Sequence, residues 1–477
     1  MRFSTRVVLN SIFNLGSMTV TTLVGFFLIP FIIGHLDKPA YGVWTLTASI
    51  FSYTGILALG LNSSINRIIP VNLVRKDYGG IRDAMSTGFV FYLMMSLVIM
   101  AATAIITIFF PYMFNVKEEL IHASRVSVAV TGIGFAVFFP MSLFSAVLSG
   151  IQRYDIIASI GTVASLLKAA LVVALFNAGF GLISLVVISA AVQIAEISIH
   201  KFFASRLCPE AEIRLSNASR AAFKEMIGYS LNTFLYASGS LLLFQSSSLV
   251  IGLLLGTSAV AEYSVPVTLV SILNAVIMSL TNVLKPAASH LDAASDLENL
   301  RRIYIRSAKY AWMLIFPAVY ALAVFSRPLI TGWVGEKFEH VSDILVILSI
   351  SQGFYVGQMS TFFIIVGIGR HRFFGATILI TAVFNIALSF VLIKFLDLGL
   401  YGAAIGFAAP LFIASAVFIP LHACSVMSVP FPEMLRESFI KPLILSTPYL
   451  IYLVVVRRLY YPDNLPIAAV EVCAGGI

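Results

Sequence analysis

Long runs of apolar residues without charge recur along almost the whole of this 477-residue sequence. A chain that crosses a bilayer must form its backbone hydrogen bonds internally, as an α-helix does, and an α-helix needs about 20 apolar residues to cross a core about 30 Å thick. The runs reach that length and predict thirteen membrane-spanning helices, two of which lie in the stretch Ile156–Ala195. The segments are Val7–Ile33, Pro39–Asn66, Ala84–Val116, Val126–Gln152, Met226–Ala261, Tyr263–Leu284, Ile344–Gly369, Phe373–Ile393, Ile156–Ala195, Tyr310–Ser326, Leu398–His422 and Pro442–Val456.

The composition excludes the common soluble classes. Hydrophobic residues make up 59% of the chain and charged residues 11%, whereas a soluble domain carries about 25% charged residues. The three cysteines, Cys208, Cys424 and Cys473, are too few and too scattered for a disulfide scaffold or a zinc site. We therefore expect an all-α polytopic membrane protein.

The basic residues predict an orientation. Most of the 30 Lys and Arg residues fall in the loops that share a side with the N-terminus, and cytoplasmic loops are the ones enriched in Lys and Arg. We expect a multi-pass protein of the bacterial inner membrane with a cytoplasmic N-terminus. The net charge of +8 then reflects topology and contact with anionic membrane lipids, and it needs no nucleic-acid partner.

Three segments recur at nearly one spacing, which indicates an internal duplication. Each copy has six spans, an even number, so the copies face the same way across the membrane. We expect two six-helix lobes related by a pseudo-twofold axis along the membrane normal. The matches are Gly150–Ile157 with Gly367–Phe374 at an offset of 217, Leu36, Ala40 and Trp44 with Leu255, Ala259 and Tyr263 at 219, and Gly179–Phe180 with Gly399–Leu400 at 220.

The duplication divides the chain into four parts. Residues 1–203 form the N-terminal lobe, 204–222 a cytoplasmic linker and 223–424 the C-terminal lobe. Residues 425–477 add a thirteenth helix and the start of a fourteenth, which we interpret as truncated because its apolar run stops after a few turns.

Enzyme chemistry finds little support. No Gly-rich loop ends in Gly-Lys-Ser/Thr, so ATP hydrolysis by that route is not expected. The seven histidines lie in different loops or at span ends without metal-ligand spacing. No aqueous loop is long enough for a catalytic domain. We therefore expect a transporter that is not an enzyme and holds no cofactor or metal.

Two cations near the ends of spans are candidate substrate ligands. Arg67 and Lys285 lie at similar places in the two copies, each a few residues from a proline. They can either extend to the cytoplasmic headgroups or line a central cavity and bind a diphosphate. The neighbouring amides Asn66 and Asn282, and Gln245 in the seventh span, suit sugar hydroxyls, although polar residues in spans often serve helix packing instead.

Two charges lie deeper in the spans. Lys168 falls within the fifth span, and Asn385 occupies its place in the second copy. Because a charge facing lipid is expensive, Lys168 should face a cavity or pair with Glu196 of the sixth span. Glu196 is also the candidate for proton or sodium coupling, with an interfacial position as the alternative.

One signature resembles a known family. Tyr41-Gly-Val-Trp44, Tyr53 and Leu57-Ala-Leu-Gly-Leu-Asn-Ser-Ser-Ile-Asn-Arg67 are similar to the first loop and second helix of bacterial polysaccharide-repeat flippases of the O-antigen type. The stretch from Val250 through Gly256 to Tyr263 looks like the turn between their seventh and eighth helices.

The resemblance implies the fold of the multidrug/oligosaccharidyl-lipid/polysaccharide exporter superfamily, with two six-helix lobes around a cavity. It further implies that the protein translocates an undecaprenyl-diphosphate-linked oligosaccharide by alternating access. Cationic residues of the first, second, seventh and eighth helices line such cavities, and Arg67 and Lys285 fit that pattern. A cation-coupled small-molecule efflux antiporter of the same superfamily is the alternative, and a membrane-embedded glycan transferase or polymerase is the third.

Overall fold

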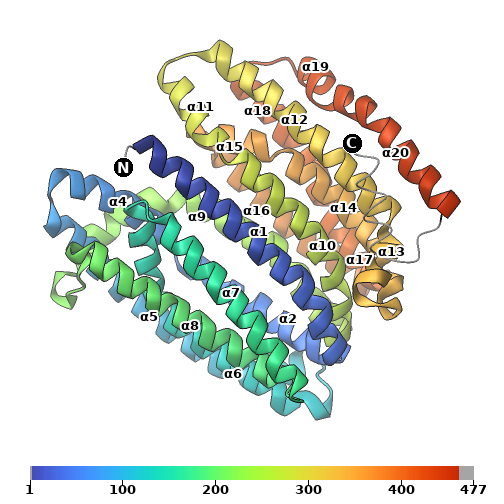
Figure 1. Cartoon of the computed structure of the whole chain (residues 1–477), viewed down its shortest axis with the longest axis horizontal. Helices are drawn as coiled ribbons and strands as arrows, with labels where there is room; N and C mark the ends of the chain where they lie inside the picture. The colour runs from blue at the N-terminus through green and yellow to red at the C-terminus, as the bar shows by residue number, and fades with distance from the viewer. Residues whose placement is uncertain (1–2, 461–477) are drawn as a thin grey trace. The chain divides into compact units, whose positions relative to one another are not determined.

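The chain folds almost entirely into helices (Figure 1). A computed structural model describes residues 3–460, without the side chains of residues 3–9, 11, 229–233 and 460. Within that range twelve helices are long and apolar enough to cross a membrane, and the count becomes thirteen when the bent pair Lys38–Leu57 and Leu61–Arg75 is one span. All thirteen predicted segments overlap these helices, so the all-α polytopic fold is confirmed. The expected start of a fourteenth helix lies outside the described residues.

The chain divides into two compact units. The first contains Met1–Leu241 and Leu255–Ser258, and the second contains Leu242–Leu254 and Ala259–Ile477. The predicted lobe and linker boundaries, like the axis that would relate the copies, stay a prediction. The elements of the first unit are α1 (Phe3–His35), α2 (Lys38–Ser52), α3 (Thr54–Leu57), α4 (Leu61–Arg75), α5 (Tyr78–Met113), η1 (Glu118–Leu120), α6 (Ile121–Gly150), α7 (Tyr154–Asn177), α8 (Leu182–Leu207), η2 (Pro209–Ala211), η3 (Leu215–Asn217) and the first part of α9 (Arg220–Leu255).

The second unit continues from the end of α9. Its elements are most of α10 (Thr257–Thr281), then α11 (Leu284–Ala293), α12 (Leu297–Val324), α13 (Ser326–Val334), η4 (Glu336–Val341), α14 (Ser342–Gly357), α15 (Met359–Gly367), α16 (Arg372–Lys394), α17 (Gly399–Ile413), η5 (Ala414–Phe418), α18 (Ile419–Met427), α19 (Phe431–Met434), η6 (Leu435–Ile440) and α20 (Lys441–Tyr460).

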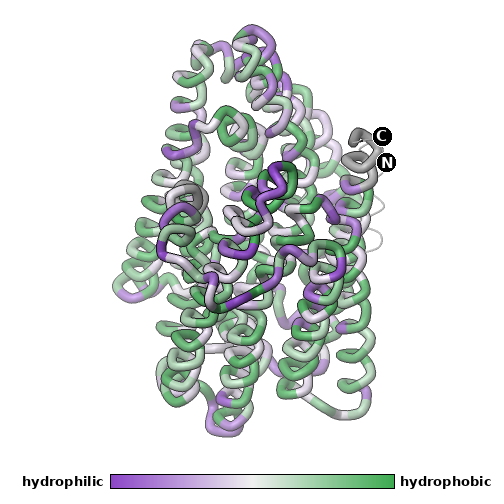
Figure 2. Tube along the Cα trace, turned by 90° about the vertical axis from the view of Figure 1, so that its left-hand side faces the viewer, coloured by the Kyte–Doolittle hydropathy of each residue, from purple (hydrophilic) through white to green (hydrophobic). Residues whose placement is uncertain are grey.

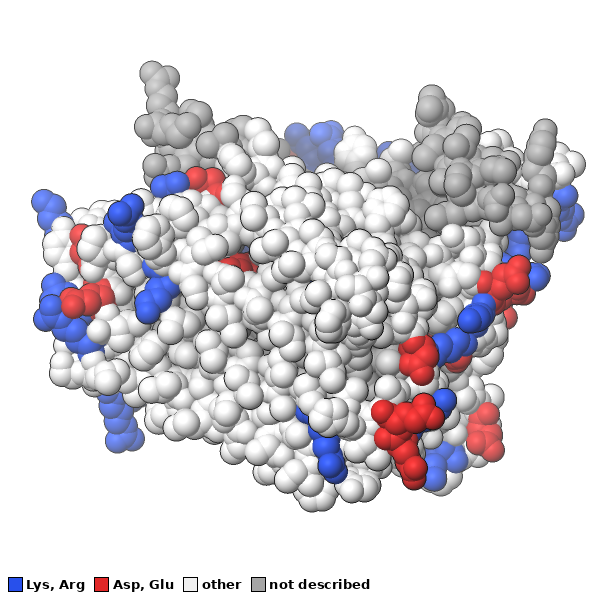
Figure 3. All heavy atoms as spheres, turned by 60° about the horizontal axis from the view of Figure 1, so that its bottom comes forward, with Lys and Arg blue, Asp and Glu red and all other residues white. Residues whose placement is uncertain are grey.

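Polar residues gather at the helix ends. The long helices are green with hydrophobic residues over most of their length, and the purple stretches concentrate in the turns (Figure 2). A space-filling view shows a broad uncharged surface, with most of the acidic and basic side chains at its margins (Figure 3). This distribution suits helices whose middles contact hydrocarbon and whose ends reach water.

The polypeptide turns repeat at the spacing found in the sequence. Left-handed backbone occurs at Lys76 and again at Ser295, an offset of 219, and each residue is followed by an aspartate that caps the next helix. Asp77 accepts from the Gly80 amide and Asp296 from the Asn299 amide. Other left-handed pairs are Gln152 with Gly369, Gly179 with Gly399 and Asn115 with Gly335. The duplication therefore extends to individual turn conformations.

The first unit includes the segment after α8. Its backbone and side chains bond to the beginning of α5: the Arg214 amide donates to Ser86 at 2.9 Å, and the Asn217 side chain donates to Asp83 at 2.9 Å. The Cys208 thiol at its start is buried, and burial raises the pKa of that thiol to about 11. The segment is thus an ordered part of the first unit.

The turn between α9 and α10 also belongs to the first unit. A Cβ atom on Gly42 of α2 would lie 1.8 Å from the carbonyl oxygen of Thr257. Only glycine allows this approach of two backbones. The first unit therefore contains a short piece of chain, Leu255–Ser258, whose flanking residues belong to the second unit.

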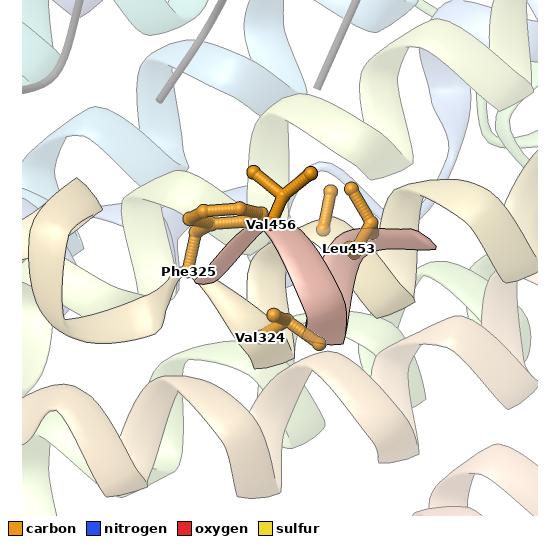
Figure 4. Packing of buried hydrophobic residues seen from close by; sticks show 5 residues of the cluster. Val324, Phe325, Leu453 and Val456 are labelled. Atoms are coloured by element: carbon orange, nitrogen blue, oxygen red, sulfur yellow. The ribbon is translucent and has the colours of Figure 1, made fainter. Parts of the chain in front are cut away.

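The thirteenth span packs along α12 of the second unit. Leu453 and Val456 of α20 contact Val324 and Phe325 at the end of α12 (Figure 4). Leu453 and Phe325 are both fully buried. This apolar cluster joins the additional helix to the second unit, while Ile444 and Leu445, nearer the start of α20, are exposed.

Candidate functional site

Arg67 lies in a polar cavity of the first unit. The cavity has a volume of about 740 Å³ and is lined by α4, the start of α5 and the first turns of α9. Arg67 is exposed and shares the lining with Arg75, and the carboxylates of Asp77, Asp83 and Glu225 lie on the same walls. The cavity thus combines guanidinium groups with acceptors for hydroxyl donors.

A break in the second span positions α4. Leu59 and Gly60 adopt left-handed conformations, and the helices on either side are bent by 49°. The single hydroxyl hydrogen of Tyr92 in α5 has two acceptors within reach, Asn62 Oδ1 at 3.2 Å and the Ala58 carbonyl at 3.4 Å. The prediction of one continuous second span missed this break, because Leu59 gives no sequence signal for a left-handed residue.

Asn66 takes part in helix packing beside Arg67. Its Oδ1 accepts a hydrogen bond from Ser149 of α6 at 2.5 Å. A Cβ atom on the adjacent Gly150 would lie 3.2 Å from Ile69 Cβ, so α4 and α6 are in close contact. The amide oxygen therefore holds the helix that carries Arg67, and the NH₂ group of Asn66 donates to no described residue.

The second-unit candidates lie around a similar contact. Asn282 forms the turn between α10 and α11, Lys285 follows in the first turn of α11, and both side chains are exposed. A Cβ atom on Gly367 of α15 would lie 2.5 Å from the Lys285 carbonyl oxygen. Gln245 lies on α9, is half-buried, and makes no hydrogen bond to a described residue. Arg67 and Lys285 belong to different units, and the central cavity that both could line stays a prediction.

Lys168 and Glu196 line one cavity inside the first unit. Its volume is about 380 Å³, and its walls come from α2, α6, α7 and α8. Within the described part of the chain no salt bridge joins the two side chains. Glu196 Oε1 lies 3.7 Å from the point where a Cβ atom on Gly161 would stand. Lys168 is seven residues further along α7, so its Cα atom lies about 10 Å beyond that of Gly161 along the helix axis.

Polar and small residues occupy the space between those charges. Gln193, Ser165, Ser189 and Thr131 line the cavity, together with the indole ring of Trp44. The cavity is therefore roomy and polar enough to hold several water molecules. Of the two arrangements expected for Lys168, a cavity or a pair with Glu196, the structure has both charges on the lining of one cavity. The small residues that create this space were not identified from the sequence.

Asn385, the counterpart of Lys168, has a packing role in the second unit. It is fully buried. Its Nδ2 donates to the Leu243 carbonyl at 3.2 Å and to Ser246 Oγ at 3.1 Å, and its Oδ1 accepts from Ser389 at 3.1 Å. These bonds join α16 to α9. In residues 3–460, no group of His, Cys, Asp and Glu side chains is arranged to hold a metal ion.

Solved structures of membrane transporters share this arrangement of helices. The lipid II flippase MurJ, in an inward closed conformation, matches with a TM-score of 0.72 and 16% identity over 98% of this chain and 96% of that chain. An inward-facing multidrug resistance MATE family transporter of the MOP superfamily matches with a TM-score of 0.66 and 17% identity, over 88% of this chain and 98% of that chain. The fold is thus the one found in transporters of the MOP superfamily.

Sequence relatives define the family more narrowly. The chain belongs to the polysaccharide biosynthesis protein family, which matches residues 36–343. The membrane protein EpsK of Bacillus subtilis is 24% identical over 420 residues, covering 87% of this chain and 82% of EpsK. A Shigella flexneri protein named as a putative O-antigen transporter is 21% identical over 408 residues, covering 84% of this chain and 94% of that protein. The resemblance noted from Tyr41–Trp44 and Leu57–Arg67 is confirmed.

Proposed function

We propose that this protein is a flippase that moves an undecaprenyl-diphosphate-linked oligosaccharide repeat unit across the bacterial inner membrane by alternating access. In this proposal the N-terminus is cytoplasmic and transport runs from the cytoplasmic to the outer face. The observation that carries it is the exposed guanidinium of Arg67 in a large polar cavity, within a chain of the polysaccharide biosynthesis family.

The chemistry of the cargo explains the need for such a cavity. A diphosphate that enters hydrocarbon without partners loses its hydration at a cost of many kcal/mol. A guanidinium group replaces that hydration with two parallel hydrogen bonds to phosphate oxygens. Arg67 and Lys285 are the proposed diphosphate ligands, and Asn66, Asn282 and Gln245 are the proposed partners of sugar hydroxyls.

Transport by proteoliposomes that contain a purified lipid-linked repeat unit tests this proposal. We expect the Arg67→Ala, Lys285→Ala double variant to slow flipping at least tenfold, since each lost charge-assisted bond weakens binding by about that factor. Lys394→Ala is the matched control, because this exposed cation lies at the far end of α16. Unchanged flipping by the double variant would exclude the two cations as substrate ligands.

We also propose that the cavity of Lys168 and Glu196 couples transport to protons or sodium ions. Ionisable groups within spans are expensive and tend to mark ion pathways, and the 380 Å³ cavity gives Glu196 polar surroundings. Glu196→Gln keeps the shape of the side chain and removes its charge. We expect flipping by this variant to lose its dependence on an imposed ion gradient, and a retained dependence would exclude Glu196 as the coupling group.

Efflux of small molecules by an antiport mechanism is the second candidate, favoured by the likeness to MATE transporter structures. Drug resistance on overexpression, with unchanged surface polysaccharide in a deletion strain, would support efflux and oppose the flippase. Formation of a glycosidic bond by the purified protein alone would instead indicate a membrane-embedded transferase.

A further inference from the structure

Two equivalent turns of the duplicated fold share one backbone conformation. After α6, the Gln152 amide donates to the Ser149 carbonyl at 3.0 Å and the Arg153 amide to the Leu148 carbonyl at 2.9 Å. After α15, the amides of Gly369 and Arg370 make the corresponding bonds at 3.1 Å and 3.0 Å, at an offset of 217 residues. Differences in chemistry between the two turns therefore come from side chains alone.

In the first unit a carboxylate neutralises the turn. Arg153 Nε lies 2.9 Å from Asp155 Oδ1, and Arg153 Nη2 lies 2.9 Å from Asp155 Oδ2. This bidentate geometry satisfies both groups. Asp155 also lies in the first turn of α7, where a negative charge complements the helix dipole.

In the second unit the residue equivalent to Asp155 carries the opposite charge. Arg372 stands where the first unit has Asp155, so Arg370 has no neighbouring carboxylate of that kind. Both arginine side chains are exposed, and neither forms an ion pair or side-chain hydrogen bond with a described residue. The first turn of α16 contains no acidic residue.

A third cation lies beside these arginines. The close contact of Gly367 with the Lys285 carbonyl brings α11 against the end of α15, and Ser289 Oγ donates to the Gly367 carbonyl at 2.5 Å. Burial lowers the pKa of His371 below its usual value, and the positive charge of Lys285 lowers it further. Lys285 therefore acts electrostatically on the residue between the two arginines, and its ammonium group has no partner among the described residues.

We propose that Lys285, Arg370 and Arg372 form a binding site for the phosphate or diphosphate group of a lipid. Three cations without a carboxylate repel one another, and a multivalent phosphate anion between them relieves that repulsion while accepting several charge-assisted hydrogen bonds. The first unit lacks such a site because its equivalent arginine, Arg153, already forms an ion pair with Asp155. Whether the phosphate belongs to the transported lipid rests on the proposed function, whereas binding of a phosphate does not.

Native mass spectrometry of the purified full-length protein tests this site. The two probes are undecaprenyl diphosphate and phosphatidylglycerol, each titrated against the wild type and the variants. Arg372→Asp recreates the arginine–carboxylate pair of the first unit, and Arg372→Gln removes only one charge. Lys394→Gln is the matched control, since it removes an exposed cation from the other end of the same helix. Size-exclusion profiles establish that each variant is folded.

We expect Arg372→Asp to weaken binding of undecaprenyl diphosphate at least tenfold and Arg372→Gln to weaken it severalfold, with no change for Lys394→Gln. If the wild type binds undecaprenyl diphosphate and Arg372→Asp binds it equally well, the site is overturned and the proposed function is untouched. If only phosphatidylglycerol binds through Arg372, the site stands as a bilayer-lipid site and the proposed function loses support. Equal losses for Arg372→Gln and Lys394→Gln would reduce the effect to net charge and overturn the site.

Discussion

The contact between α7 and α8 in the first unit differs from that between α16 and α17 in the second. At Gly406 of α17 a Cβ atom would lie 2.3 Å from Ser389 Oγ and 2.6 Å from Ser389 Cα, so α16 and α17 touch along their backbones. At the offset of 220 that relates Gly179 to Gly399 before these helices, the equivalent of Gly406 is Val186, which lines the 380 Å³ cavity together with Ser189. One copy of the duplicated fold has a closed helix contact, and the other has an open one.

The charges follow the same division. The closed contact contains Asn385, whose hydrogen bonds are satisfied by α9 and Ser389. The open contact contains Lys168 and Glu196, which no described partner neutralises directly. Close packing of small residues and satisfied amides stabilises membrane helices, whereas unpaired charges at membrane depth do not. The comparison teaches that the second unit packs this contact tightly, while the first leaves a cavity there that contains two charges.

The largest expected effect comes from filling the closed contact. Gly406→Val should reduce the free energy of unfolding by about 3 kcal/mol, because the added atoms overlap the Ser389 backbone and force the helices apart. Ser189→Val adds atoms to an open cavity, and we expect a change below about 1 kcal/mol. Unfolding of the detergent-purified protein by heat or denaturant compares the two variants, and equal losses would contradict the difference in packing.

The second effect concerns the polar residue at the middle of each contact. Asn385→Leu leaves the Leu243 carbonyl and Ser246 without their donor, so we expect a loss of about 1–2 kcal/mol. Lys168→Met should leave stability unchanged or raise it, since the ammonium group has no direct partner, and it should slow transport. The same unfolding assay and a flipping assay measure the two outcomes. A Lys168→Met variant as unstable as Asn385→Leu would show that the lysine is structural.

A smaller effect tests a helix contact that occurs in equivalent form within each unit. Ser149 bonds α6 to Asn66 of α4, and Ser289 bonds α11 to Gly367 of α15. Removing either hydroxyl, in Ser149→Ala or Ser289→Ala, should reduce the free energy of unfolding by about 0.5–1 kcal/mol. Similar losses would show that the duplicated contact has kept its structural role, and a loss in only one variant would extend the divergence to this contact.

The smallest effect is a dependence on pH at a duplicated helix cap. Hydrogen bonds from the side chain and the backbone of Asn299 lower the pKa of Asp296 below its ordinary value. The folded-state pKa is the lower one, so the carboxylate stabilises the protein above the unfolded-state pKa of about 3.9, and this contribution disappears as pH falls through the folded-state pKa. Asp296→Asn should therefore slightly lower the unfolding temperature at pH 7, and the difference from the wild type should shrink as the pH falls below the unfolded-state pKa of about 3.9. Asp77→Asn provides the comparison at the equivalent cap.

The sequence predicted the spans well because hydropathy is a local property. A run of about 20 apolar residues must cross the bilayer as a helix whatever its neighbours are. The fifth and eleventh spans, α7 and α16, match the expected segments to within a few residues. The ninth span was expected from Tyr310, whereas α12 begins at Leu297, because the charged turns before Tyr310 continue the helix beyond the apolar run.

The candidate site could be predicted only in part. Sequence gave the depth of Lys168 and Glu196 along their helices, but their separation depends on how α7 and α8 are rotated and spaced by Gly161 and Ser189. The bent second span escaped prediction for a related reason, since a left-handed Leu59 is stabilised by tertiary contacts such as those of Tyr92. The position of a residue along its span follows from the order of residues in the sequence, whereas the direction in which its side chain points depends on tertiary packing.

The short turn Leu255–Ser258 belongs to the first unit although the chain on both sides of it belongs to the second. Thr257 completes the surroundings of Gly42, although the residues on both sides of the turn belong to the other unit. The polypeptide thus passes between the units three times, and a single cut in the loop after α8 would place the first part of α9 and Leu255–Ser258, all belonging to the first unit, on the fragment that carries the second unit. A gene split at that loop would encode an N-terminal chain that needs the C-terminal chain to complete its unit.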